Sequence, residues 1–183
     1  MDTRVADQLR LHSGHLDFIG RSHIWIDDYD RADSVRFAQF ALANALAHTA
    51  PGQLEVLVFD DALKGIAAPF QEVNSGGEKI LRHINDVQEL NETIKYLHEH
   101  VRSVLNVIQG RTESLLEFRQ QLSPKVEGFK LVVLSTIYDL LSDEIRDKLT
   151  VLLKAGPAAG VTFLIHSMKL KVNEEILNLT QLC

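Results

Sequence analysis

The fold is decided by the stretch Ser22-His23-Ile24-Trp25-Ile26-Asp27-Asp28-Tyr29-Asp30-Arg31-Ala32-Asp33-Ser34-Val35-Arg36-Phe37. It begins with a short apolar strand, Ile24 to Ile26, which meets a polar turn. A helix rich in Ala and Phe follows, and then a second apolar strand from Leu54 to Phe59. This order of strand, turn, helix and strand is typical of units that hold a phosphate group on the turn.

The turn itself lacks the residues that hold phosphate. Such a turn needs glycines, whose backbone N–H groups cradle the phosphates, and a lysine that neutralises them. Here the turn has no glycine and no lysine, and it carries the carboxylates Asp27, Asp28, Asp30 and Asp33. Because four carboxylates repel a triphosphate, the sequence predicts the shape of an ATPase without its chemistry.

Composition limits the class of protein. The chain has 183 residues, of which 45% are hydrophobic, enough for one domain with a sizeable core. The net charge of -6 and the pI of about 5.7 argue against broad DNA binding by this chain alone. The one cysteine, Cys183, excludes a disulfide scaffold or Cys-ligated zinc within the chain. No apolar run approaches the roughly 20 residues that span a bilayer, so we expect no direct membrane insertion.

Four apolar runs that do not alternate with polar residues predict strands buried on both faces, as in parallel sheets. They are Ile24 to Ile26, Leu54 to Phe59, Leu131 to Leu134 and Val161 to Ile165. Helical patterns lie between them, and the alternation predicts an α/β domain with three layers, α/β/α, and a mainly parallel sheet. We expect residues 1–183 to form a single domain that is part of a longer chain.

The helical patterns differ in character. Val35 to His48 is apolar nearly all round and is predicted to be a buried helix. Val87 to Ile108 has apolar residues at spacings of three and four, which predicts an amphipathic helix. Thr112 can cap a shorter helix, and Ser142 can cap another. The stretch from Asp61 to Asp86 is interpreted as an irregular connection.

Several segments match one known family in position. They are Ser22–Ile26, Ser34-Val35, Leu54–Asp60 followed by Lys64-Gly65, Leu97–Arg102, Leu131–Leu141 and Ala159–Ile165. In this order they resemble the motor domain of the FtsK/SpoIIIE and HerA class of RecA-like P-loop ATPases. The resemblance covers roughly Leu9 to Met168. It implies that Ser34 is the serine that follows the Walker A lysine, and that residues 131–141 contain the Walker B strand.

The residues at the family's catalytic positions depart from the pattern. Asp33 stands where the Walker A lysine belongs, allowing one deletion. Ser135 and Thr136 stand where the Walker B aspartate and the catalytic glutamate belong, and Met168 replaces the sensor glutamine. Mg²⁺ loses its main protein anchor, and the attacking water loses the carboxylate that activates it. The resemblance therefore implies a pseudo-ATPase, although the parent chain or assembly can still be an ATPase.

We expect the degenerate nucleotide site to bind neither ATP nor a metal ion, and we expect no catalytic residue in it. Its residues are Asp28, Asp30, Asp33, Ser34, Ser135, Thr136, Asp139 and Met168. The acidic turn is interpreted as a solvated turn in which Asp33 is the N-cap of the helix that follows, because acids complement a helix N-terminus. Its spacing is not that of an EF-hand loop.

The leading hypothesis is a structural or regulatory module in a bacterial motor assembly, in DNA translocation, in defence or in type VII secretion. Its expected partners are other RecA-like ATPase domains of the same chain or copies of itself, with DNA reached through the full assembly. The docking face should include Asp27 to Asp33 and Ser135 to Asp139. We expect a cytoplasmic location, with any tether to the inner membrane supplied by the parent protein.

Two other functions stay open at this point. The first is a DNA translocase domain that binds ATP and Mg²⁺ with catalytic residues supplied by a neighbour, and nucleotide binding would reveal it. The second is a nucleotide-free module that contacts DNA, which salt-dependent DNA binding would reveal.

Overall fold

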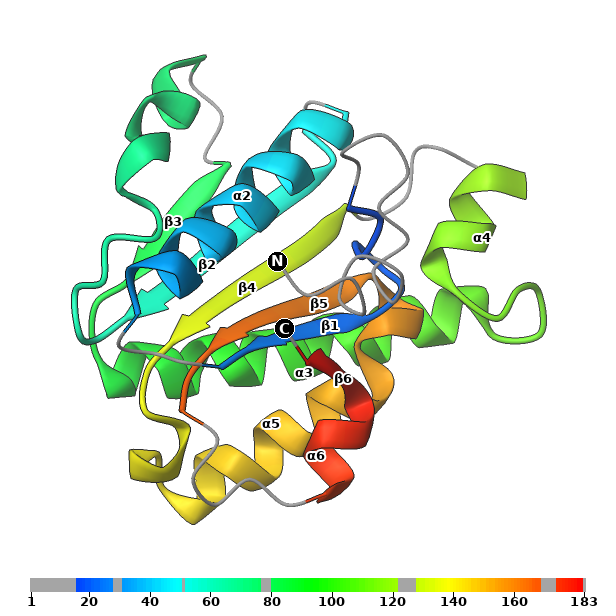
Figure 1. Cartoon of the computed structure of the whole chain (residues 1–183). Helices are drawn as coiled ribbons and strands as arrows, with labels where there is room; N and C mark the ends of the chain where they lie inside the picture. The colour runs from blue at the N-terminus through cyan, green and yellow to red at the C-terminus, as the bar shows by residue number, and fades with distance from the viewer. Residues whose placement is uncertain are drawn as a thin grey trace.

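A single parallel sheet forms the centre of the domain (Figure 1). The computed structural model describes residues 16–27, 31–50, 52–76, 80–121, 128–168 and 174–182. Within these residues the sheet has six strands in the order β3-β2-β4-β5-β1-β6, and every neighbouring pair is parallel. The strands are β1 His23–Ile26, β2 Leu54–Asp60, β3 Leu81–Ile84, β4 Phe129–Ser135, β5 Val161–His166 and β6 Thr180–Leu182.

Helices cover both faces of the sheet (Figure 1). On one face lies α2, Ala32–His48, and on the other lie α3, Val87–Ile108, and α5, Asp143–Ala155. The shorter helices are α4 Leu115–Gln121, α6 Glu174–Leu179 and the 3-10 helices η1 Ala68–Gly76, η2 Tyr138–Leu140 and η3 Pro157–Ala159. The predicted three-layer α/β/α class with a parallel sheet is confirmed.

The four predicted strands correspond to β1, β2, β4 and β5. All residues of β1, β4 and β5 are buried, as expected for strands with helices on both faces. The predicted strand Leu54 to Phe59 lies one place in from the sheet edge and is mostly buried, which confirms its predicted place inside the sheet.

The prediction of an irregular connection from Asp61 to Asp86 is wrong. This stretch contains η1 and the edge strand β3, which pairs with β2. Only Leu81 and Ile84 of the four residues in β3 are buried. The strand is therefore too short to show a hydrophobic pattern in the sequence. The side-chain amide of Asn74 pairs with the backbone of Leu81, donating to its carbonyl at 2.7 Å and accepting from its N–H at 2.9 Å.

Two predicted helix caps are also wrong. The N-cap of α2 is Arg31, whose backbone is extended, and Asp33 lies in the first turn of the helix. At the start of α4 the Ser114 hydroxyl accepts the N–H of Glu117 at 3.2 Å, so Ser114 takes the place predicted for Thr112. The predicted cap of α5 is confirmed, since Ser142 accepts the N–H of Ile145 at 3.4 Å.

Helix α2 is buried along one face only, although its sequence predicts a buried helix. Ala38, Ala41 and Ala45 pack in the core, whereas Phe40 on the outer face is 41% exposed. The sequence could not show this because alanine suits both a core and a surface position on a helix.

Candidate functional site

The ends of four strands meet at the carboxyl edge of the sheet. In the sheet register Asp60 of β2 lies opposite Ser135 of β4, and Ser135 lies opposite His166 of β5. His166 in turn lies opposite Ile26, the last residue of β1. Ligands of open α/β sheets bind outside the carboxyl ends of the strands. This edge, together with the start of α2, is therefore the candidate site.

A buried histidine joins the two serines of the predicted nucleotide site. The His166 Nε2 atom lies 2.9 Å from the hydroxyl of Ser34 in the first turn of α2. Its Nδ1 atom lies 3.1 Å from the hydroxyl of Ser135 at the end of β4. All three residues are buried. We refer to this arrangement of Ser34, His166 and Ser135 as the His166 bridge.

The hydrogen-bond pattern fixes the tautomer of the ring. The Ser34 hydroxyl donates its single hydrogen to the carbonyl of Arg31 at 2.7 Å, so toward His166 it can only accept. The Nε2 atom of His166 therefore carries a proton and donates it to Ser34, while its Nδ1 atom lies within hydrogen-bond distance of the Ser135 hydroxyl. In a serine nucleophile pair a carboxylate orients the far nitrogen of the histidine. Here the far nitrogen of His166 contacts the Ser34 hydroxyl instead.

The carboxylates of Asp60 and Asp61 near this edge accept hydrogen bonds from the loops that follow β2 and β4. The Thr136 hydroxyl donates to Asp61 Oδ2 at 2.8 Å, which links the loops that follow β4 and β2. The two oxygens of Asp60 accept the backbone N–H groups of Lys64 at 2.9 Å and Gly65 at 2.8 Å. These carboxylates therefore shape the turn after β2.

Two leucines on the same loops point into solvent. Leu63 in the turn after β2 is 88% exposed, and its φ of 52° lies in the left-handed region that a leucine rarely adopts. Leu140 in η2, after β4, is 79% exposed. The candidate site is thus flanked by exposed apolar side chains, one of them on a strained backbone.

The loop after β4 continues into the protein interior. The backbone N–H of Tyr138 donates to the Ser167 hydroxyl at 2.8 Å, and its ring packs edge-on against Trp25 with centroids 5.5 Å apart. Burial raises the pKa of Tyr138 to about 12, so the phenol stays neutral at physiological pH. Asp139 lies 3.9 Å from Arg146 of α5, and its second carboxylate oxygen is buried without a hydrogen-bond partner among the described residues.

The structure brings together only part of the predicted site. Ser34 and Ser135 are joined through His166, and Thr136 bonds to Asp61. The other predicted residues lie apart from the bridge or outside the described part of the chain. Asp33 is exposed and pairs with Arg36 at 3.3 Å, Asp139 contacts Arg146, Met168 is half-buried, and Asp28 and Asp30 lie outside the described residues.

Sequence reasoning missed His166. It directly follows the predicted strand Val161 to Ile165, and a polar residue after an apolar run is ordinary at a strand end. Its role depends on the register of β4 and β5, which places it beside Ser135, and on the position of α2 above both. The available signal was a histidine at the carboxyl end of a predicted parallel strand, where ligands of such sheets bind.

The residues at this edge do not fit Mg²⁺ and a nucleotide. In P-loop enzymes a serine or threonine and a Walker B aspartate hold the metal ion, and a lysine contacts the phosphates. The resemblance assigns these two ligand positions to Ser34 and Ser135, and the imidazole of His166 lies between the two hydroxyls. The lysine position carries Asp33, which adds negative charge. Among the described residues no group of three or more His, Cys, Asp or Glu side chains is arranged to hold a metal ion.

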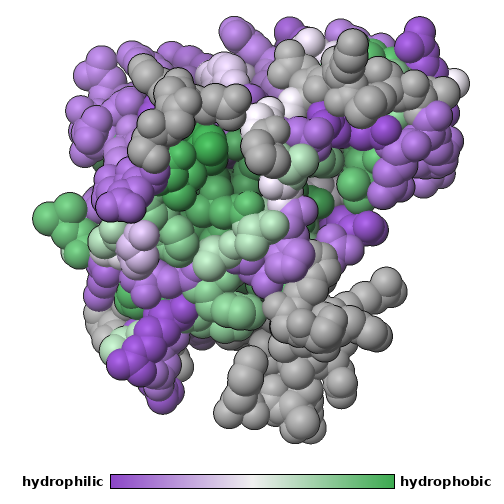
Figure 2. Space-filling view, turned by 90° about the horizontal axis from the view of Figure 1, so that it is seen from above, coloured by the Kyte–Doolittle hydropathy of each residue, from purple (hydrophilic) through white to green (hydrophobic). Residues whose placement is uncertain are grey.

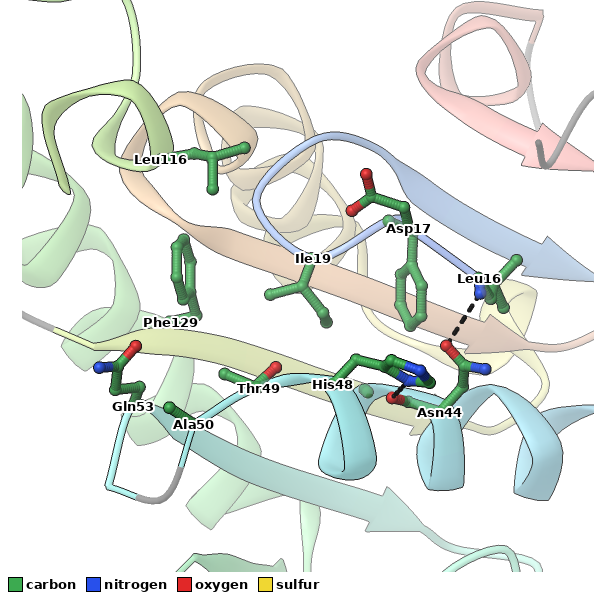
Figure 3. A pocket seen from close by; sticks show the side chains of 12 residues that line it. Leu16, Asp17, Ile19, Asn44, His48, Thr49, Ala50, Gln53, Leu116 and Phe129 are labelled. Carbon is green, nitrogen blue, oxygen red and sulfur yellow. Dashed lines mark hydrogen bonds between the residues drawn. The ribbon is translucent and has the colours of Figure 1, made fainter. Parts of the chain in front are cut away.

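A pocket of about 170 Å³ lies at the opposite, amino end of the sheet (Figure 3). Leu116, Phe129 and Ile19 supply much of its apolar lining. Two of its polar side chains bond to the protein: Asn44 accepts the N–H of Leu16 at 2.9 Å, and His48 Nδ1 lies 2.9 Å from the Asn44 carbonyl. Along the described ranges, no helix combines the length and apolarity needed to span a bilayer.

Solved structures with the same fold include ATPase domains of type VII secretion proteins. ATPases 2 and 3 of EssC from Geobacillus thermodenitrificans match 86% of this chain and 30% of their own, with a TM-score of 0.72 and 14% identity. The cytoplasmic domain of the type VII secretion ATPase EccC from Thermomonospora curvata matches 88% of this chain and 19% of its own, with a TM-score of 0.68 and 17% identity. The RecA-like P-loop ATPase fold implied by the resemblance is confirmed.

A third structure with this fold is that of ATPases 2 and 3 of Thermomonospora curvata EccC in complex with a signal sequence peptide. It matches 86% of this chain and 29% of its own, with a TM-score of 0.64 and 14% identity. The chain thus spans less than a third of each of these neighbours. No family model matches the sequence, and no curated protein matches it either. Identities this low establish a fold and leave activity to be argued from the site.

Proposed function

We propose that this chain is a catalytically inactive FtsK/HerA-like ATPase domain that acts as a structural or regulatory interaction module in a larger motor assembly. The observation that carries the proposal is the His166 bridge. It places an imidazole, with hydrogen bonds at 2.9 and 3.1 Å, between the two positions that hold Mg²⁺ in active P-loop enzymes. A domain that keeps this fold but lacks the residues that bind Mg²⁺ and nucleotide can still contact other proteins through its surface.

Type VII secretion is the pathway that the neighbours favour, because the matched structures are domains of its coupling ATPases. The EssC structure and the EccC complex each contain ATPases 2 and 3 of their protein, so domains of this fold occur in tandem there. By this analogy the partner of the chain is another RecA-like domain, from the same longer protein or from a second copy. The proposed location is the cytoplasm, with membrane attachment left to the parent protein.

Exposed apolar residues support a role in docking. Leu63 and Leu140 lie on the loops that follow β2 and β4, and Phe40 lies on the outer face of α2. Figure 2 looks down on the molecule of Figure 1 and shows an apolar patch bordered by hydrophilic side chains. A contiguous patch of apolar side chains in contact with water is typical of an interaction surface. Asp33 and Asp61 lie near the carboxyl edge of the sheet and would favour a basic partner surface.

The test is calorimetric titration of the protein with ATP and Mg²⁺, followed by a phosphate-release assay. We expect no heat of binding at micromolar concentrations and no release above background. Ser34→Ala is the matched control, because it alters the site and leaves the surface unchanged. Micromolar binding, or hydrolysis that disappears in Ser34→Ala, would overturn the proposal; hydrolysis that is unaffected by Ser34→Ala comes from a contaminant.

A further inference from the structure

We propose that the His166 bridge permanently makes the connection that Mg²⁺ and a nucleotide make only when they are bound. It joins the start of α2 to the ends of β4 and β5 without any ligand. This inference rests on the proposed function, because a site that took up Mg²⁺ and ATP would need the space that the ring fills.

The positions of the two serines carry the argument. In an active site of this fold, the metal ion draws together a hydroxyl at the start of the helix and a carboxylate at the end of the Walker B strand. Ser34 and Ser135 stand at these two positions. The His166 ring reaches both from a third element, β5, and each of its nitrogens has one serine partner. Three elements are thus held by one side chain that is part of the chain itself.

Backbone contacts extend this connection across the edge. The N–H of Thr136 donates to the carbonyl of His166 at 3.2 Å, and the N–H of Ser167 donates to the carbonyl of Ile26 at 3.1 Å. The Thr136 hydroxyl continues to Asp61 on the loop after β2. A continuous set of hydrogen bonds therefore runs from α2 through β5 and β4 to the loop that carries Leu63, with a branch from Ser167 to β1.

The consequence concerns the conformation of the surface. A ligand shifts a domain between states only when it binds one of them better. A connection built from the protein's own side chains is present at every nucleotide concentration, so α2 and the loops after β2 and β4 keep one arrangement. We infer that the domain offers its partner a constant docking surface while the nucleotide state of neighbouring domains changes.

The bridge can be tested by hydrogen exchange in wild type, His166→Ala and His23→Ala. His23 is the matched control, because its ring is also fully buried and also bonded on both sides, to the Leu153 carbonyl at 2.9 Å and the Phe163 N–H at 2.9 Å. It lies at the amino end of β1, away from the candidate site. Both variants lose global stability, so local exchange at residues 31–40 and 131–137 is compared with exchange in α3.

We expect His166→Ala to speed exchange at residues 31–40 and 131–137 roughly tenfold relative to α3, because each of these segments loses one buried hydrogen bond to the ring. His23→Ala should leave this ratio unchanged. The same ratio in wild type and His166→Ala, or the same local effect in His23→Ala, would overturn the inference.

Milder variants keep the test decisive if His166→Ala fails to fold. Ser135→Ala removes one hydroxyl at the end of β4, and through the ring it should still speed exchange at the start of α2. Unchanged exchange at residues 31–40 in Ser135→Ala counts against the bridge. Titration of wild type with Mg²⁺ and ATP separates the two ideas: binding there refutes the proposed function, whereas the exchange ratios refute only the role of His166.

Discussion

Thr136 donates its side-chain hydrogen to a carboxylate oxygen of Asp61 across 2.8 Å, and this bond joins the loops after β4 and β2. Thr136 stands where the resemblance places a catalytic glutamate. In this chain that position therefore faces an existing carboxylate. Replacing Thr136 with glutamate tests whether the site tolerates a second carboxylate beside Asp61.

Thr136→Glu should destabilise the protein and should not produce hydrolysis. The new carboxylate would lie against Asp61, and two like charges a few ångströms apart in a partly buried site cost about 1–3 kcal/mol. Urea unfolding at pH 7.5 measures the loss. Thr136→Gln is the control of equal size without the charge, and an equal loss of stability in both variants would show that repulsion is not the cause.

Asp33→Lys should not create an ATP-binding site. It restores the charge of the missing lysine, but the His166 bridge still lies between Ser34 and Ser135. Asp33 is exposed and its ion pair with Arg36 is exposed as well, so we expect little change in stability. Calorimetry with Mg²⁺ and ATP decides the matter, with Asp33→Ala as control. Tight binding by Asp33→Lys alone would mean that the site is one substitution from function.

Stability should fall in acid because of His23. Its Nδ1 accepts the N–H of Phe163, and burial lowers its pKa from 6.5 to about 4. Below pH 6.5 the unfolded chain takes up a proton that the folded protein refuses, so folding free energy is lost as pH falls to about 4. The loss amounts to about 3 kcal/mol, an order-of-magnitude figure.

Unfolding curves for wild type and His23→Gln at pH 7.5, 5.5 and 4.5 test this prediction. Wild type should lose more stability than His23→Gln over this interval, because glutamine has no proton to gain. Parallel loss in both proteins would assign the acid sensitivity to carboxylates instead.

Leu63→Gly should stabilise the domain by up to about 1 kcal/mol. Leucine pays roughly 1–2 kcal/mol for a left-handed backbone, and glycine avoids this cost while adding some entropy to the unfolded chain. Leu63 is 88% exposed, so its removal leaves no cavity. Leu63→Ala is the control that keeps the strain, and it should be neutral. Both variants should weaken assembly if Leu63 contacts a partner, and unchanged assembly would remove it from the docking surface.

Reversing the charge of Asp28, Asp30 and Asp33 should weaken assembly of the full-length protein, most strongly at low salt. The expected partner surface is basic, and screening by salt reduces such attraction. The control reverses Glu92, Glu99 and Asp147, which are exposed on α3 and α5. Sedimentation of both proteins at several salt concentrations gives the comparison. Unchanged assembly in the first variant, with the domain folded, would leave the acidic turn as a solvated loop.

The strands with unbroken apolar runs could be predicted from sequence because burial on both faces demands them. β4 and β5 extend the predicted runs only by Phe129, Lys130, Ser135 and His166 at their ends. α3 has the predicted bounds, because its apolar stripe is long and because Asp86, a residue type typical of N-caps, directly precedes it. The edge strand β3 could not be predicted, because its partner on β2 supplies the stability that four residues lack.

The candidate site was predictable in position and not in chemistry. Alignment with the family's landmarks located Ser34 and Ser135, which do come together. The connection between them runs through His166, and only sheet register and helix placement put that ring in reach of both. Sequence spacing carries no information about contacts across 132 residues.

The amide of Asn74 has a consequence for how such domains are strung together. By occupying the N–H and carbonyl of Leu81, it withholds hydrogen-bonding groups of β3 from any strand that arrives from outside. Domains of one fold in tandem meet at high effective concentration while they are being synthesised, and open strand edges then lead to swapped or misassembled sheets. A single asparagine thus protects this edge of the sheet, and replacing it with alanine should lower the yield of correctly folded protein.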